Sequence, residues 1–285
     1  MKAIAIDRFG GPEQLTKRGF PKPEPQSDEV LIRVVAAGIS RLDAIACRGE
    51  ARESIGVAFP WIPGFEVAGV IEQLGLECRR FRTGDRVYAL LPAGGGYAQF
   101  AAVKEGRVAP MPASLLFEEA AALPLDGFAA WRALFDGDNP VTGSSSVIVR
   151  GASSGAGHLV VQIALAAGAR VFVDAPEEHR EFLEKLGRVE WFDVANEPSA
   201  DRRIDASTSG ACVEGWIDLC GSARSGQAAG LRSDHPHEPV AGLSSMVEQR
   251  RVRPRLFKIL NIGQAVEAHQ GVESAAACGK LALTL

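Results

Sequence analysis

Apolar and polar residues alternate over short stretches of the first 115 positions, and glycine or proline separates these stretches. The clearest are EVLIRVVAAG (29–38), EVAGVIEQLG (66–75), DRVYALL (85–91) and YAQFAAV (97–103). Alternation with a period of two between turn residues is typical of β-strands. We therefore predict that this part of the chain is β-rich.

The apolar period becomes helical in SLLFEEAAALPLDGFAAWRAL (114–134), where Ser114 can cap a helix ahead of Glu118 and Glu119. A strand, a glycine-rich turn, a helix and a second strand follow in VIVRGASSGAGHLVVQIALAAGARVFVD (147–174). EKLGRVEWFDV (184–194) and GWIDLCG (215–221) each contain a further short apolar strand. This alternation predicts a parallel sheet of at least four strands.

A chain of 285 residues suits about two domains. The change of pattern predicts a β-rich domain over residues 1–117 and a parallel-sheet domain over residues 118–255. Residues 256–285 contain a predicted helix from about Ile262, a glycine turn and a terminal strand. We expect this last segment to return to the β-rich domain.

Charge and composition exclude several classes of protein. The net charge is −4 and the pI is near 5.8, with no basic stripe, so nucleic acid is not an expected partner. No apolar run reaches the roughly 18 residues that span a bilayer, so no membrane association is expected. The start, MKAIAID, lacks the pattern of a secretory signal, which predicts a cytoplasmic protein.

The chain has five cysteines, widely spaced and without a CxxC pair. This pattern predicts separate reduced thiols rather than a disulfide framework or a structural zinc site.

The glycine-rich turn GASSGAG, residues 151–157, carries the clearest chemistry. Glycines let the backbone leave a strand tightly, and the first amides of the next helix then attract an anion such as a pyrophosphate. The spacing is GxxxGxG, which by itself is also typical of any tight turn from a strand to a helix. Its position between two apolar strands favours a dinucleotide site.

Two families have turns of this kind. GASSGAG is similar to the cofactor turn of short-chain dehydrogenases, but that family needs a YxxxK pair. Here Tyr88 and Tyr97 are followed four residues later by Pro92 and Ala101, and the turn lies about 150 residues into the chain. The short-chain interpretation fails.

The medium-chain dehydrogenase/reductases match in order through nearly the whole chain. The matching blocks are MKAIAIDRFGGPEQL, DEVLIRVVAAGIS, PGFEVAGVIEQLG, RTGDRVYAL, GGGYAQF, AAALPLDGFAAWRAL, VIVRGASSGAG and EAHQGVESAAACGKLALTL. Among its branches the chain most resembles the zinc-independent quinone oxidoreductases. The resemblance implies an α/β fold, with a GroES-like β-rich domain beside a Rossmann-type parallel-sheet domain that is shortened here.

The resemblance also bears on metal binding. Zinc alcohol dehydrogenases of this superfamily hold the catalytic metal through a Cys and a His, and those slots contain Ser40 and Phe65 here. A hydroxyl is a poor zinc ligand and a phenyl ring is none, so no zinc is expected. We expect the nearby Asp43 and Glu66 to make structural hydrogen bonds.

The implied activity is hydride transfer from a reduced nicotinamide to a quinone, an enone or another α,β-unsaturated carbonyl. Ser40 and Tyr97 are the candidate catalytic residues. A serine that caps a turn is an equally ordinary interpretation of Ser40, and a partly buried packing tyrosine is the more common interpretation of Tyr97. Phe59 and Trp61 are candidate pocket walls. The candidate cofactor-binding residues are Gly151, Ser153, Ser154, Gly155, Ala156, Gly157, Asp174, Arg180 and Cys220.

Two residues make opposite predictions about the cofactor. Asp174 ends the second strand of the βαβ unit, where a carboxylate binds a ribose 2′-hydroxyl and favours NAD(H). Arg180 falls where the quinone reductases place a basic residue for the 2′-phosphate of NADP(H). Because that branch mostly uses NADP(H), we predict NADP(H) and leave NAD(H) open.

The stretch from Ser222 to Pro254 is shorter than in relatives, which carry two further strands there and build a homodimer through their last strands. Loss of these strands argues against that homodimer. It also keeps open a second hypothesis, in which the chain is a degenerate member that binds a nucleotide or small ligand without catalysis, as a sensor or partner subunit.

Overall fold

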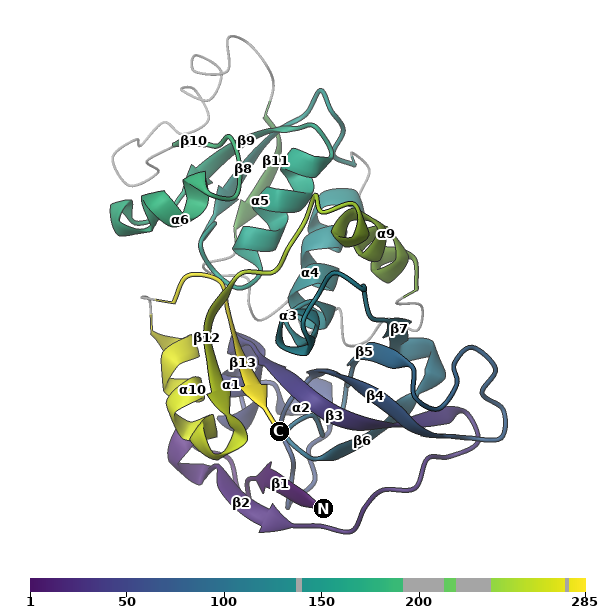
Figure 1. The fold of residues 1–285 in the computed structure, drawn as a ribbon. Helices are drawn as coiled ribbons and strands as arrows, with labels where there is room; N and C mark the ends of the chain where they lie inside the picture. Colours follow the sequence, from purple (N-terminus) through teal and green to yellow (C-terminus); the bar gives the residue numbers. More distant parts are fainter. Residues whose placement is uncertain (137–139, 192–212, 219–236, 275–276) are drawn as a thin grey trace.

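The computed structural model describes residues 1–136, 140–191, 213–218, 237–274 and 277–285. Within these residues the strands form a two-stranded hairpin, a seven-stranded sheet and a four-stranded sheet. In Figure 1 the seven-stranded sheet lies in the lower half of the molecule and the four-stranded sheet in the upper half. This is the mixed architecture that the sequence predicts, with a β-rich layer and a separate parallel sheet.

The seven-stranded sheet has the order β12-β13-β3-β4-β5-β7, and β6 also pairs with β3. The long strand β3 is central and pairs with β4, β6 and β13. Helices α3 and α10 pack against it, and most of its apolar residues are buried. The two C-terminal strands join this sheet, since β13 pairs antiparallel with β3. The bounds are β3 (Glu29–Ile39), β4 (Glu66–Leu74), β5 (Arg86–Leu90), β6 (Phe100–Lys104), β7 (Val108–Pro110), β12 (Leu256–Asn261) and β13 (Lys280–Thr284).

The four-stranded sheet has the order β10-β9-β8-β11, and every pair in it is parallel. This confirms the predicted parallel sheet. Among the described strands, β11 pairs only with β8 and therefore ends the sheet on that side. The bounds are β8 (Ser146–Arg150), β9 (Arg170–Asp174), β10 (Glu190–Trp191) and β11 (Val213–Asp218).

Helices α3 and α4 lie between the two sheets (Figure 1). Helix α3 packs on β3, β4 and β13, whereas α4 packs on α5 and α9. The α-helices are α1 (Arg41–Cys47), α2 (Arg52–Ile55), α3 (Phe117–Ala121), α4 (Pro124–Phe135), α5 (Gly157–Ala166), α6 (Arg180–Glu184), α9 (His237–Glu248) and α10 (Ala265–Glu273). The hairpin is β1 (Lys2–Ala5) with β2 (Thr16–Gly19), and 3-10 helices span Pro12–Gln14, Glu105–Arg107, Glu177–His179 and Ile262–Gln264.

The helical stretch after position 114 starts later than predicted and is divided. Leu116, not Ser114, is the N-cap of α3, and its amide donates to the Glu119 carboxylate at 3.0 Å. Proline has no amide hydrogen to continue a helix but fits the first helical position, so a new helix begins at Pro124.

None of the described helices is both long and apolar enough to cross a membrane.

Candidate nucleotide-binding turn and the buried groups beside it

The glycine-rich turn joins β8 to α5, and its shape requires two of its glycines. Gly151 has φ +72°, a conformation that other residues adopt at a cost. A Cβ atom at Gly157 would overlap the Gly151 carbonyl oxygen and the Ala152 backbone. Helix α5 starts at Gly157.

The amides of this turn fall into two groups, those with a hydrogen-bond partner and those without one. Gly151, Ser154 and Gly157 donate their amides within the protein, the last to the Ser154 hydroxyl at 3.0 Å. Within the described part of the chain, four other amides have no hydrogen-bond partner, those of Ala152, Ser153, Gly155 and Ala156. Free amides beside the start of a helix suit an anion, so the turn fits the diphosphate of a dinucleotide.

Two buried histidines hold the turn in place. The Ser153 hydroxyl lies 2.8 Å from His179 Nδ1. His158 Nδ1 lies 3.1 Å from the Ser154 carbonyl oxygen, and His158 Nε2 accepts from the Arg255 amide at 3.0 Å. Burial lowers the pKa of His158 to about 4, so the ring is neutral at pH 7 and can donate at one nitrogen while accepting at the other.

A buried ionic group lies directly beside the turn. Lys280 Nζ contacts the carboxylates of Glu66 and of Asp126, the latter at 2.8 Å, and all three side chains are almost fully buried. A Cβ atom at Gly155 would lie 2.6 Å from Asp126 Oδ2. The Leu125 amide also donates to Glu66 at 2.9 Å. The group thus joins β4, α4 and β13 beside the turn.

Burial opposes charge on Glu66 and on Lys280. It raises the pKa of Glu66, and the positive charge of Lys280 only partly offsets this effect. Burial likewise disfavours the charged form of Lys280, but the carboxylates of Asp126 and Glu66 outweigh it and hold the lysine pKa above its ordinary value. The lysine therefore stays protonated.

The candidate catalytic residues Ser40 and Tyr97 are both buried, and neither is an isolated hydroxyl. The Ser40 amide and hydroxyl each donate to Asp43 Oδ2 at 2.8 Å, at the start of α1. The Tyr97 hydroxyl lies 3.1 Å from His269 Nε2 on α10. The structure therefore places both in hydrogen-bonded clusters, and Asp43 and Glu66 make the structural hydrogen bonds that the sequence predicts.

The slots for zinc ligands contain no suitable donors. The Ser40 hydroxyl is engaged with Asp43, and Phe65 is fully buried and offers only carbon atoms. No group of three His, Cys, Asp or Glu residues lies in a metal-binding arrangement among the residues described.

The two residues that bear on cofactor choice both have ionic partners. Asp174 Oδ2 lies 3.2 Å from Arg150 Nε. Arg180 pairs with Glu177 at 2.8 Å and with Glu184 at 3.5 Å, and its guanidinium lies 4.1 Å from the centre of the Trp191 ring. Cys220 lies outside the described residues.

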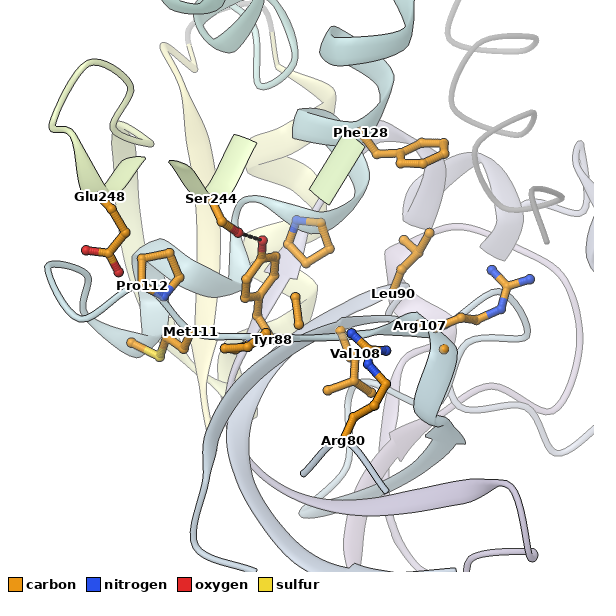
Figure 2. Close-up of a pocket in the computed structure, with 15 residues that line it drawn as sticks. Arg80, Tyr88, Leu90, Arg107, Val108, Met111, Pro112, Phe128, Ser244 and Glu248 are labelled. Atoms are coloured by element: carbon orange, nitrogen blue, oxygen red, sulfur yellow. Dashed lines mark hydrogen bonds between the residues drawn. The ribbon is translucent and has the colours of Figure 1, made fainter. Parts of the chain in front are cut away.

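An apolar pocket of about 670 Å³ lies between β5, β7, α4 and α9. Figure 2 shows Leu90 and Phe128 on its wall and the Tyr88 hydroxyl bonded to the Ser244 hydroxyl, a contact of 2.7 Å. Leu90 pairs directly with Glu66 across β4 and β5, so the pocket adjoins the buried ionic group. Phe59 and Trp61 do not line this pocket.

Phe59 and Trp61 pack elsewhere. Trp61 is buried and donates its indole N–H to the Ala93 carbonyl at 2.8 Å. Phe59 packs edge-on against Phe9, with 4.9 Å between ring centres.

The structure combines a GroES-like sheet, a Rossmann-type parallel sheet and a glycine-rich turn, an arrangement typical of nucleotide-binding folds. Comparisons with known proteins agree with this assignment. Residues 26–113 match the family model "Alcohol dehydrogenase GroES-like domain". The mouse quinone oxidoreductase is 40% identical over 179 residues, which are 62% of this chain and 53% of that protein. The guanaco quinone oxidoreductase is 32% identical over 257 residues, which are 90% of this chain and 76% of that protein.

Solved structures match the whole fold. A crystal structure of an NAD-dependent alcohol dehydrogenase superposes with a TM-score of 0.86 at 24% identity, covering 100% of both chains. A mycobacterial protein complexed with NADPH superposes with a TM-score of 0.83 at 21% identity, again covering 100% of both chains.

The chain therefore belongs to the medium-chain dehydrogenase/reductase superfamily, in its quinone oxidoreductase-like branch. Its alignment spans about half the length of the mouse and rat quinone oxidoreductases.

Sequence reasoning missed most of the groups that support the turn. Lys280 and Asp126 are single charges within apolar stretches, GKLALTL and LPLDGF, and a charge in such a stretch is a signal for a buried ion pair. His158 and His179 lie in helical or turn segments, and nothing in their local sequence indicates their partners.

Proposed function

We propose that the chain binds a reduced nicotinamide dinucleotide and transfers its hydride to an electrophilic acceptor, a quinone, an enone or another α,β-unsaturated carbonyl. The observation that carries this proposal is the set of four free amides from Ala152 to Ala156 beside the start of α5. Relatives named quinone oxidoreductases and a similar fold complexed with NADPH support it.

In this proposal the backbone of residues 152–156 holds the diphosphate. The Lys280 ionic group and the two histidines keep the turn rigid, which preserves the positions of the amides before the ligand arrives. The nicotinamide supplies the hydride once it is bound. The protein supplies position and hydrogen bonds.

The residues at the two zinc-ligand slots favour chemistry without zinc. In the zinc alcohol dehydrogenases a Lewis acid polarises the alcohol for oxidation, and the engaged Ser40 and the carbon-only Phe65 offer a metal no ligands at those slots. An acceptor that is already electrophilic needs no such activation. The apolar pocket beside Leu90 and Phe128 suits an apolar acceptor of this kind.

The proposed cofactor is NADPH, with NADH as the alternative. Arg150 offsets the charge of Asp174, which otherwise repels a 2′-phosphate. Arg180 begins α6 next to His179, whose ring contacts the Ser153 hydroxyl of the turn, so it brings a second positive charge near the turn. Glu177 and Glu184 compete for Arg180, so we expect the preference for NADPH to be modest.

The test is to incubate the purified chain with NADPH or NADH and a panel of quinones and enones, and to follow nucleotide absorbance at 340 nm together with nucleotide binding. We expect saturable binding and acceptor-dependent oxidation. Saturable binding with no oxidation for any acceptor would instead support the second candidate, a non-catalytic nucleotide binder. That candidate is favoured by the short stretch from Ser222 to Pro254 in the sequence.

A further inference from the structure

The pocket between β5, β7, α4 and α9 has apolar walls. Leu90, Val108, Met111 and Phe128 line it with buried side chains. Its volume of about 670 Å³ lies within the range of sites that hold a small organic molecule. Apolar walls select an apolar body and discriminate weakly among such bodies, so the polar groups of the pocket must supply any further selection.

The charged groups of the pocket lie at its two ends. In the view of Figure 2, Arg80 and Arg107 lie on one side of the pocket, and Glu248 lies on the opposite side. Hydrogen bonds keep the two arginines together, because Arg80 bonds to Glu105, the first residue of the 3-10 helix that ends at Arg107. One end of the pocket is therefore positively charged and the other negatively charged.

The acidic end and the middle of the pocket already have hydrogen-bond partners. Glu248 Oε1 accepts from the Ala113 amide at 2.8 Å. The hydroxyls of Tyr88 and Ser244 bond to each other at 2.7 Å. Burial raises the pKa of Tyr88 to about 12, so this pair is uncharged at pH 7. Neither place needs a charged ligand to satisfy its polar groups.

The basic end differs, because Arg80 has no carboxylate partner among the described residues. Its guanidinium donates one hydrogen bond, to the Glu105 carbonyl oxygen at 3.1 Å, although a guanidinium has five N–H groups. The Glu105 carboxylate accepts instead from the amides of Arg79 and Arg80, at 2.9 and 2.7 Å. The remaining N–H groups of Arg80 are available to an anionic ligand.

We propose that this pocket selects acceptors with an apolar body and a carboxylate end group, and that Arg80 is the specificity-determining residue that pairs with the carboxylate. The planar fork of a guanidinium matches the two oxygens of a carboxylate. Arg107 adds positive charge at the same end. This inference rests on the proposed function and names its substrate class, a quinone or an α,β-unsaturated carbonyl whose apolar body carries a carboxylate.

The first test measures binding without turnover. The fluorescent probes 8-anilinonaphthalene-1-sulfonate and N-phenyl-1-naphthylamine share one aromatic body, and only the first has an anionic group, which stands in for the carboxylate. Arg80→Gln should raise the dissociation constant of the sulfonate about fivefold and leave that of the neutral probe unchanged. Arg82→Gln is the matched control, because Arg82 is exposed nearby and does not line the pocket. It should change neither constant.

Methionine methyl signals show where the probes bind. The chain has three methionines, and Met111 is the one that lines the pocket. In protein labelled with 13C-methyl methionine, both probes should shift the Met111 signal and leave the Met1 signal in place. An unshifted Met111 signal, or a sulfonate affinity that Arg80→Gln leaves unchanged, would overturn the proposal whether or not the protein reduces any acceptor.

The second test uses turnover of two matched quinones, 2-methyl-1,4-naphthoquinone and 3-(3-methyl-1,4-naphthoquinon-2-yl)propanoate. Arg80→Gln should raise KM for the carboxylate about fivefold, and it should leave KM for the neutral quinone and kcat for both unchanged. An unchanged KM for the carboxylate would refute the role of Arg80 while leaving the hydride-transfer proposal in place. If the unmodified protein reduced neither quinone, the proposed function and the substrate class would fail, whereas the anion site would stand or fall on the probe titrations.

Discussion

At the scale of single residues, the site depends on charged side chains that are buried and paired with opposite charges. Lys280 is the clearest case, because the carboxylates of Asp126 and Glu66 hold the pKa of this buried lysine above its ordinary value. Arg180 is the opposite case, since it is exposed and its glutamate partners are exposed as well. Exposed ion pairs of this kind contribute little to the free energy of unfolding. Arg180 can therefore leave its glutamate partners and bind a ligand with little loss of stability.

This difference leads to a prediction for Arg180→Ala. We expect it to weaken NADPH binding severalfold and to leave NADH binding within about twofold, because only NADPH carries the 2′-phosphate. Calorimetric titration with both nucleotides measures the change. Lys185→Ala is the matched control, since Lys185 follows α6 and pairs with Glu181 in the same way. Equal losses for both nucleotides would remove Arg180 from the 2′-phosphate site.

At the scale of elements, the turn between β8 and α5 requires glycine at one position and contains amides without a hydrogen-bond partner among the described residues. Gly157 has no space for a side chain, because the Gly151 carbonyl oxygen occupies the position of its Cβ atom. The turn must therefore open if residue 157 is anything but glycine. Opening it displaces the free amides that precede the helix.

We accordingly predict that Gly157→Ala abolishes measurable nucleotide binding and lowers the melting temperature. Gly143→Ala is the control, because the nearest atom that a Cβ at Gly143 would meet is the Ala167 carbonyl oxygen at 3.5 Å, an ordinary contact. Fluorescence-monitored binding and thermal unfolding of both variants test this. Unchanged affinity in Gly157→Ala would show that the turn does not hold the nucleotide.

At the scale of the whole molecule, the features that could be predicted from the sequence are those that depend on a local pattern of residues. Strands such as residues 29–38 have a period of two, and the turn at Gly151 combines a strand end with a helix start, so both could be recognised from neighbours alone. Lys280 and Glu66 lie 214 positions apart, and only the pairing of β13 with β3 brings them together. The position of the apolar pocket likewise follows from the packing of α9 on α4, which no local pattern encodes.

The central claim is that the free amides of the glycine-rich turn bind a nicotinamide dinucleotide. Amide chemical shifts of the 15N-labelled protein, recorded during a titration with NADPH, test it most directly. The account predicts large shifts for the amides of Ala152, Ser153, Gly155 and Ala156, with saturation at one equivalent. Small or absent shifts at these four positions, while amides elsewhere in the chain respond to NADPH, would contradict it.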